Sequence, residues 1–325
     1  MRVGLQITKN PDKYKKLISL FDMDALDDIT FIHIPDLDSL KKNFKELDVL
    51  VCYGISPKYF EYRSENLKWI HIGASGVDGN LFPEILKSRV MITNAKGINS
   101  KPVAEFIISQ ILYFSKKIDA CQEYKTEKKW NQWELASQTT QLSELTLGII
   151  GYGEIGKELS KLAKSFGMEV LATRRLQKKV ESKKFVDSLV PTSDMNMLIK
   201  RSDFLAVACP LTPKTENMID KKVFKMMKKS AVIINTSRGG IINEDDLIQA
   251  LKNKDISGAA LDVYATEPLD PKSELFDIKN VLMSPHISGN FSSYQEIMIK
   301  QFNDMLIKHL NNKALKNRVC KKRLY

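Results

Sequence analysis

Hydrophobic positions along the chain fall into short runs that alternate with polar segments of helical spacing. The first runs are rich in β-branched residues, and segments rich in Lys and Asp separate them. This alternation is typical of parallel βα units, in which each helix returns the chain to the same edge of a sheet. We therefore predict strands at 2–7, 29–34, 48–53, 69–74 and 90–94.

A second series of apolar runs follows an amphipathic stretch at 101–124, whose apolar residues recur at i, i+3 and i+4. That stretch predicts one long helix, with Pro102 in a first turn that tolerates proline. Another amphipathic helix is predicted at 292–310, and the basic end after it is expected to fray. The strands of the second series are predicted at 145–151, 169–174, 203–209, 230–236, 257–263 and 280–285.

The two series predict an α/β fold of two Rossmann-like or flavodoxin-like parallel-sheet domains with a cleft between them. A chain of 325 residues suits two domains of ordinary size. The long helix and the segment after 287 are expected to be the two crossings, which makes the N-terminal domain discontinuous. We predict a substrate domain at 1–98 and 291–325 and a dinucleotide-binding domain at 99–290.

Composition narrows the class of protein. The chain is 43% hydrophobic and 27% charged, as in globular proteins, and no apolar run approaches the roughly 20 residues that cross a membrane. Its start, "MRVGLQITKN", resembles a first strand more than a signal peptide. The cysteines lie far apart with no C-x-x-C pair, which favours a reducing cytoplasm and argues against a metal site or disulfides. They are Cys52, Cys121, Cys209 and Cys320.

A net charge of +11 raises the question of nucleic-acid binding. The lysines are spread along the whole chain, and neither zinc-finger spacing nor an RNA-recognition aromatic motif is present. A solvated basic surface, which also suits an anionic small substrate, is the interpretation we adopt. We expect no nucleic-acid partner and no membrane.

A glycine-rich loop carries the first candidate chemistry. Gly151, Gly153 and Gly156 form G-x-G-x-x-G between an apolar strand and an amphipathic helix. In a dinucleotide-binding loop the first glycine permits the tight turn, the second lets the pyrophosphate approach the backbone, and the third lets helix and strand pack closely. Phosphates would lie on the N–H groups of Glu154 and Ile155 at the start of the helix. A purely structural βα turn is the alternative.

Three reactive side chains follow later strands of the second series. Arg238 precedes Gly239-Gly240, Glu267 precedes Pro268, and His286 follows Pro285. Singly, each has a structural alternative: a surface ion pair, a solvated carboxylate and a structural histidine. Together they lie beyond the carboxyl ends of parallel strands, where ligands bind in open α/β sheets. We predict that these three form a catalytic group.

The order G-x-G-x-x-G, S-R-G-G, D-V-Y-x-x-E-P, P-H-I resembles the D-isomer-specific 2-hydroxyacid dehydrogenase family. The resemblance covers nearly the whole chain. It includes N-terminal motifs at 73–80 and 94–106 and a loop at 209–219.

The resemblance implies a role for each residue. Arg238 would hold the carboxylate and carbonyl oxygen of a 2-oxoacid, and His286 would donate the proton. Glu267 would orient the histidine ring. Amides of Ser75, Gly76 and Val77 would form a second carboxylate grip, and Asp262 would bind the nicotinamide carboxamide. Further implied cofactor contacts are Cys209, Pro210 and Thr215 on the adenine side, with Thr236, Ser237, Ser288 and Gly289.

The strand "EVLATR" bears on cofactor choice. NAD-binding family members place an Asp at its end, whereas this chain has Arg174, followed by Arg175. A guanidinium pairs with a 2′-phosphate through charge-assisted hydrogen bonds, and Thr173 adds a hydroxyl. NADPH is therefore the predicted cofactor, with NAD possible. A pair of surface arginines is the alternative.

The resemblance points to glyoxylate/hydroxypyruvate reductases, with a small 2-oxoacid as substrate. Phosphoglycerate dehydrogenases carry an arginine where this chain has Tyr53, which argues against a phosphorylated substrate. A phosphoglycerate or D-lactate type dehydrogenase remains an alternative, as does a non-enzymatic nucleotide-sensing regulator. The insertion at 127–138, within an arm at 120–142, resembles the family's dimerisation arm. Trp130 and Trp133 would anchor a homodimer, unless they pack within the subunit.

Overall fold

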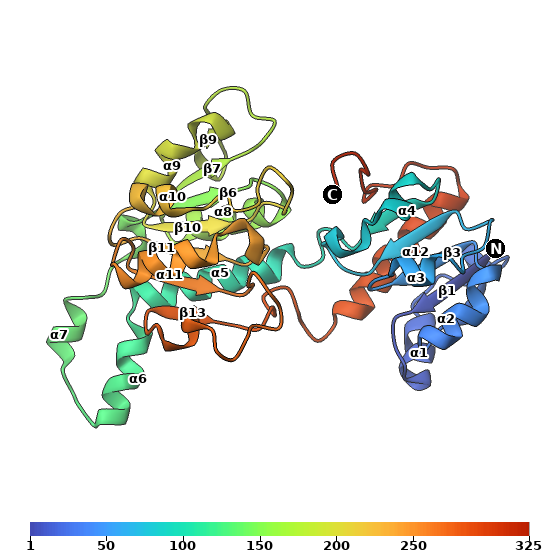
Figure 1. The fold of residues 1–325 in the computed structure, drawn as a ribbon, viewed down its shortest axis with the longest axis horizontal. Coiled ribbons are helices and arrows are strands. Elements are labelled where there is room, and N and C mark those ends of the chain that lie inside the picture. The colour runs from blue at the N-terminus through green and yellow to red at the C-terminus, as the bar shows by residue number, and fades with distance from the viewer. Residues whose placement is uncertain (325) are drawn as a thin grey trace. The chain divides into compact units, whose positions relative to one another are not determined.

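The computed structural model describes residues 1–324, which form two compact units (Figure 1). The first unit is Met1–Asn99 together with the chain from Phe291 onward, and the second unit is Ser100–Asn290. Each unit contains one sheet whose strands are parallel, with a single antiparallel exception. The predicted α/β class is therefore confirmed.

The first unit has a five-stranded parallel sheet in the order β2-β1-β3-β4-β5. Its central strands β3 and β4 are buried throughout, because helices cover both faces of a parallel sheet. Helix α12 packs Met298, Ile299 and Phe302 into the core formed by β1, β3 and β4. The strands are β1 Arg2–Gln6, β2 Thr30–His33, β3 Val49–Cys52, β4 Trp69–Ile72 and β5 Met91–Asn94; the helices are α1 Pro11–Ile18, α2 Leu37–Asn43, α3 Pro57–Phe60, α4 Pro83–Lys87 and α12 Tyr294–Leu310.

The C-terminal segment pairs with the exposed edge of this sheet. Arg318 forms an antiparallel bridge with Thr93, and the Val319 amide donates to the Ile92 carbonyl at 2.9 Å. The expectation of a frayed basic end is wrong for this segment. Edge strand β5 offers unpaired backbone groups, and Val319 buries its side chain, which is 7% exposed, in the apolar cluster beneath.

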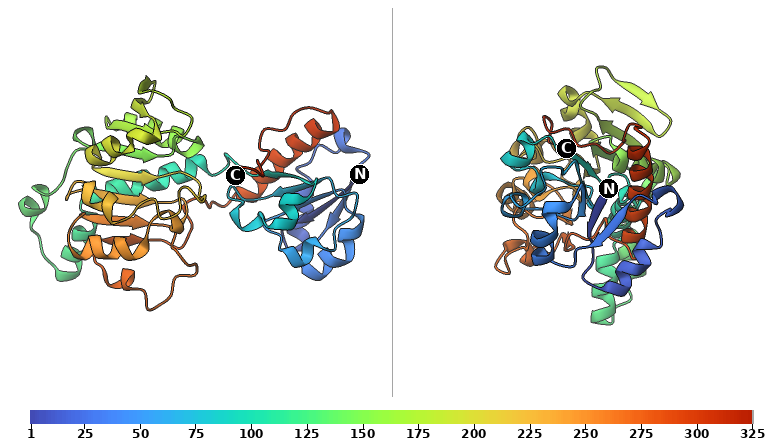
Figure 2. Two further views of the ribbon diagram at one scale, coloured as in Figure 1. Left: turned by 45° about the horizontal axis from the view of Figure 1, so that its top comes forward. Right: turned by 90° about the vertical axis from the view of Figure 1, so that its right-hand side faces the viewer.

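The second unit has an eight-stranded sheet in the order β13-β12-β11-β10-β6-β7-β9-β8. Alternate residues of its central strands enter two different apolar clusters. Helices α9, α10 and α11 complete one cluster, and α5 and α8 complete the other (Figures 1 and 2). The strands are β6 Thr146–Ile150, β7 Glu169–Thr173, β8 Glu181–Lys183, β9 Val186–Val190, β10 Phe204–Val207, β11 Val232–Asn235, β12 Gly258–Leu261 and β13 Val281–Met283; the helices are α5 Ser100–Ser115, α8 Glu154–Ser165, α9 Met195–Arg201, α10 Lys221–Met226 and α11 Glu244–Lys252.

The single helix predicted at 101–124 is two helices. α5 ends at Ser115, and α6 (Ile118–Glu127) begins after Lys117, whose φ of 52° is left-handed. α6 and α7 (Gln132–Ala136) project from the body of the second unit (Figure 1). Trp130 and Trp133 are 88% and 80% exposed. Packing of these tryptophans within the subunit is therefore excluded.

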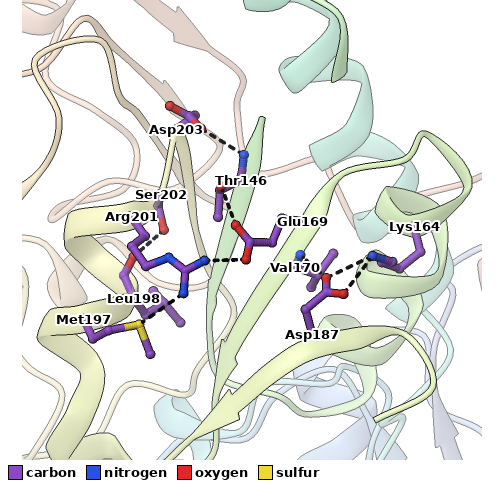
Figure 3. A network of polar contacts seen from close by, with 10 residues as sticks. All are labelled: Thr146, Lys164, Glu169, Val170, Asp187, Met197, Leu198, Arg201, Ser202 and Asp203. Atoms are coloured by element: carbon purple, nitrogen blue, oxygen red, sulfur yellow. Dashed lines mark hydrogen bonds and ion pairs between the residues drawn. The ribbon is translucent and has the colours of Figure 1, made fainter. Parts of the chain in front are cut away.

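A polar network fixes the amino ends of the central strands of the second unit (Figure 3). Asp203 accepts from the Thr146 amide at 2.9 Å, and the Thr146 hydroxyl donates to Glu169 at 3.0 Å. Asp187 accepts from the Val170 amide and pairs with Lys164. These contacts stabilise the edge of the sheet that lies opposite the candidate site.

Candidate active site

The predicted site residues of the second unit gather at the carboxyl edge of its sheet. Because β6, β7, β10, β11, β12 and β13 are parallel, the residues that follow them leave the sheet on the same side. Gly151 follows β6, Arg174 follows β7, Arg238 lies past β11, Glu267 past β12 and His286 past β13.

The glycine loop has a distinct geometry at each position. Gly151 has a φ of +108°, and a Cβ there would lie 2.7 Å from the Ala208 carbonyl oxygen. A Cβ on Gly153, the residue that caps α8, would meet nothing within 4 Å. A Cβ on Gly156 would lie 2.6 Å from the Gly151 carbonyl oxygen, so helix and loop are in close contact. The loop leaves open space above its second glycine, at the start of a helix, which fits a bound phosphate.

Side chains beside this loop differ in exposure. Thr173 is 2% exposed, and its Oγ1 accepts from the Gly151 amide at 3.3 Å. The next residues, Arg174 and Arg175, are exposed. Glu154, in the first turn of α8, forms an ion pair with Lys157. The structure thus places both arginines directly after β7, which pairs with β6, the strand that leads into the glycine loop.

Arg238 lies on a loop that packs against the segment leading to Glu267. Its Nη1 donates to the Ser237 carbonyl at 2.7 Å, and its own carbonyl accepts from the Asn235 amide group at 3.0 Å. A Cβ on Gly239 would lie 1.9 Å from the Tyr264 carbonyl carbon. Only glycine permits this approach, which brings the loops after β11 and β12 together.

His286 and Glu267 form a hydrogen-bonded pair. His286 Nδ1 donates to Glu267 Oε2 at 2.7 Å, and Glu267 Oε1 accepts from the Tyr264 amide at 3.1 Å. The imidazole is thereby oriented with Nε2 directed away from the carboxylate. A ring held in this way can give or take a proton at Nε2.

Asp262 shapes the loop that carries the histidine. This carboxylate is fully buried and accepts from Ser284 Oγ at 2.6 Å and from the amides of Ile287 and Ser288 at 2.8 and 2.9 Å. The His286 amide donates to the Asp262 carbonyl at 2.8 Å, and His286 has a left-handed φ of 53°. Asp262 therefore fixes the backbone at the histidine.

A hollow of about 720 Å³ adjoins the pair. Glu267 and His286 lie on its wall, which is otherwise largely apolar and includes Leu269, Phe276 and Met283. No cluster of three or more His, Cys, Asp or Glu side chains suited to a metal ion occurs among residues 1–324. None of the helices in this range is long and apolar enough to cross a membrane.

The remaining predicted cofactor residues lie on neighbouring loops of the same edge. Burial raises the pKa of the Cys209 thiol to about 12, which favours the neutral thiol over the thiolate. Thr215 Oγ1 donates to the Pro210 carbonyl at 2.7 Å, and Ser237 Oγ donates to the Cys209 carbonyl. Thr236 and Ser288 are buried, and Gly289 is half-buried.

Ser75, Gly76 and Val77 follow β4 in the first unit. The Ser75 carbonyl accepts from the Asn94 side-chain amide at 2.6 Å, and the Ser75 hydroxyl donates to Asn99 Oδ1 at 2.7 Å. Both asparagines lie within the motif region 94–106, but no role was predicted for them.

Two residues of the second unit also escaped prediction. Ser284 donates to Asp262, and Glu244 Oε2 accepts from the Ala265 amide at 3.0 Å. Ser284 directly precedes Pro285-His286 in the sequence, but it was given no role, because its contact with Asp262 forms only in the folded chain. Glu244 lies some twenty residues from its partner and was likewise given no role.

Comparison with known proteins identifies the family. The NAD-binding domain of the D-isomer specific 2-hydroxyacid dehydrogenases matches residues 108–288. Glyoxylate reductase of Thermococcus litoralis is 34% identical over 263 residues, or 78% of each chain. Glyoxylate reductase/hydroxypyruvate reductase of Homo sapiens is 34% identical over 237 residues, or 72% of this chain and 71% of the human protein.

A solved structure shares the fold. The NADPH-dependent glyoxylate/hydroxypyruvate reductase of Sinorhizobium meliloti, determined with NADP and sulfate, superimposes with a TM-score of 0.85 at 21% identity. The match covers 100% of this chain and 99% of that chain. The sequence motifs, the domain match and relatives that align with over two thirds of the chain agree, and the chain belongs to the D-isomer specific 2-hydroxyacid dehydrogenase family of NAD(P)-dependent oxidoreductases.

Proposed function

We propose that this protein reduces a small 2-oxoacid to the D-2-hydroxyacid, with NADPH as the preferred cofactor. The observation that carries the proposal is the His286–Glu267 pair, at 2.7 Å, on the same sheet edge as Arg238 and the glycine loop. The relatives named as glyoxylate and hydroxypyruvate reductases support the choice of substrate class.

In the proposed mechanism Arg238 binds the substrate carboxylate and carbonyl oxygen through its planar guanidinium. The nicotinamide cofactor, when bound, supplies the hydride. His286 donates the proton from Nε2 to the oxygen that becomes the hydroxyl, and Glu267 holds the ring at Nδ1 and stabilises the charged imidazolium. The carboxyl group of the substrate is further held by the amides of Ser75, Gly76 and Val77.

The residues present fit a dinucleotide. The open space above Gly153 at the start of α8 suits a pyrophosphate, because the N–H groups in the first turn of a helix point toward an anion bound there. Arg174 and Arg175 suit the extra phosphate of NADPH because an acidic residue, which would repel it, is not found at the end of β7. We assign cofactor binding to the second unit and the second carboxylate grip to the first unit.

Substrate choice is inferred from the first unit. Cε1 of the Tyr53 ring lies 3.2 Å from the position that a Cβ on Gly73 would occupy. The ring therefore borders the segment that leads to Ser75. Tyr53 also lines a hollow of about 790 Å³ with Asp36 and Asp38. Lys9 lies on the same wall, so what argues against a phosphorylated substrate is Tyr53, which stands where phosphoglycerate dehydrogenases carry an arginine. We therefore propose glyoxylate or hydroxypyruvate as substrates, and not a phosphorylated oxoacid.

We also propose a homodimer in a reducing cytoplasm. Trp130 and Trp133 on the projecting segment expose large aromatic surfaces of the kind that subunit contacts cover. All four cysteines are free thiols. Light scattering at micromolar concentration should give twice the chain mass of 37.0 kDa. A mass of one chain would contradict the dimer.

The experiment is NADPH oxidation by a panel of 2-oxoacids, followed by absorbance. We expect glyoxylate and hydroxypyruvate to be reduced, and phosphohydroxypyruvate to be reduced with a much lower kcat/KM. Faster reduction of the phosphorylated compound would favour a phosphoglycerate-type dehydrogenase.

A further inference from the structure

We propose that Asn94, held by the C-terminal segment Asn317–Val319, is a positioning residue for the substrate carboxylate. The inference rests on the proposed function, in which the amides of Ser75–Val77 bind that carboxylate. It adds a cause for their orientation: a hydrogen bond from the side-chain amide of Asn94, a β5 residue whose backbone pairs with the C-terminal segment.

The central contact joins Asn94 to the peptide that carries a proposed donor. Asn94 is 7% exposed, and its Nδ2 donates to the Ser75 carbonyl at 2.6 Å. The Ser75 carbonyl and the Gly76 amide belong to one planar trans peptide and point in opposite directions. Holding the carbonyl toward Asn94 therefore aims the Gly76 N–H to the other side, away from β5.

A second tether acts on the Ser75 side chain. Its hydroxyl oxygen lies 2.7 Å from Asn99 Oδ1, to which it donates, and 3.3 Å from the Ala95 carbonyl. The Ala95 amide in turn donates to the carbonyls of Ile72 and Ala74 at 3.0 and 3.1 Å. The Ser75 hydroxyl thus donates to the segment after β5. The backbone amides of Ser75–Val77 are therefore the groups proposed to bind an anion.

The C-terminal segment fixes the backbone on both sides of Asn94. The Asn94 amide donates to the Asn317 carbonyl at 3.2 Å, and the Val319 amide donates to Ile92 at 2.9 Å. Asn317 Nδ2 reaches the Lys96 carbonyl at 3.1 Å.

Lys321 anchors the segment beyond this pairing. Its Nζ donates to the carbonyls of Ile85 and Ser88 at 2.7 and 2.8 Å, at the end of α4. The last residues of the described chain therefore form part of the support for the proposed carboxylate grip.

Removing the Asn94 donor should release the Ser75–Gly76 peptide from its fixed orientation. The substrate carboxylate would then lose a hydrogen bond from an aimed amide, which weakens binding by about tenfold to a hundredfold. The effect should fall on the oxoacid and not on NADPH, because the residues assigned to the cofactor lie in the second unit.

The test compares Asn94→Ala, Asn317→Ala and a control, Asn43→Ala. Asn43 Nδ2 donates to the Ser39 carbonyl at 2.8 Å in the same unit, so the control removes the same kind of bond elsewhere. The readouts are Kd for oxamate, an unreactive 2-oxoacid analogue, in the presence of NADPH, together with KM, kcat, NADPH Kd and Tm.

We expect Asn94→Ala to raise oxamate Kd and KM by about tenfold to a hundredfold, with a smaller change in kcat and unchanged NADPH Kd. Asn317→Ala should shift oxamate Kd in the same direction but less, since the backbone pairing remains. Asn43→Ala should match the wild type in oxamate Kd.

Wild-type oxamate affinity in folded Asn94→Ala would overturn the positioning role. If Asn94→Ala does not fold, Asn317→Ala decides, and wild-type affinity in that variant would overturn the proposal. A wild-type protein that reduces no 2-oxoacid and binds no oxamate would instead contradict the proposed function itself.

Discussion

His286→Ala is expected to lower kcat for 2-oxoacid reduction by about a hundredfold to ten-thousandfold, the range that general acid catalysis contributes. The imidazole is oriented at Nδ1 by Glu267 at 2.7 Å, so Nε2 is the group placed to donate the proton. Alanine leaves no proton donor at this position. The measurement is kcat with the fastest oxoacid of the panel, alongside Kd for NADPH.

Cofactor affinity and folding should survive this substitution. The His286 side chain is 47% exposed, so its removal creates no buried cavity. The matched control is His33→Ala in the first unit, where the ring stacks on Tyr14 and takes no part in the proposed chemistry. A kcat in His286→Ala equal to that of wild type would refute the role of this histidine as the acid.

Arg174→Asp should reverse the cofactor preference. We expect wild type to favour NADPH over NADH in kcat/KM by about tenfold to several hundredfold, because each hydrogen bond to a charged group contributes about 1.5–3 kcal/mol. The aspartate would repel the 2′-phosphate and accept from the ribose hydroxyls of NADH. The variant should therefore lose NADPH activity and gain or keep NADH activity.

The control for this substitution is Lys179→Asp, which makes the same charge change at another exposed site in the segment after β7. It should lower kcat/KM with NADPH by much less, because Lys179 lies five residues beyond Arg174, whereas Arg174 directly follows β7, the neighbour of the glycine-loop strand β6. Equal use of both cofactors by wild type, or the same shift in Arg174→Asp and Lys179→Asp, would show that Arg174 does not select the cofactor.

Local patterns predicted the parts of the fold that depend on neighbours in sequence. Gly151, Gly153 and Gly156 were recognised because a dinucleotide turn constrains each position, and the structure shows a left-handed φ, an open Cβ direction and a close helix contact in that order. The buried parallel strands other than β9 were visible as apolar runs, since both faces of these sheets are covered.

Features that depend on distant partners were missed. β8 consists of Glu181–Lys183, a polar stretch that becomes a strand only because β9 offers an edge. The C-terminal segment was expected to fray, yet it pairs with β5, more than two hundred residues earlier in the chain. The left-handed turn at Lys117 interrupts an apolar pattern that itself continues without a break.

The candidate site residues also divide into those that local sequence patterns reveal and those that depend on distant partners. Arg238, Glu267 and His286 stood out because reactive side chains followed predicted strands beside Gly or Pro. The positions of Ser284, Glu244 and Asn94 gave no comparable sign, because their role is to hold other groups through contacts that only the folded chain creates.

The central claim is hydride transfer to C2 of a 2-oxoacid. Its most direct test uses wild-type protein with NADPH that carries deuterium at the transferable position, and glyoxylate and hydroxypyruvate as substrates. Mass spectrometry and chiral chromatography then analyse the product. The account predicts loss of NADPH absorbance with both oxoacids, and a D-glycerate product from hydroxypyruvate with one deuterium at C2. No NADPH oxidation with either oxoacid, or a hydroxyacid without deuterium at C2, would contradict it.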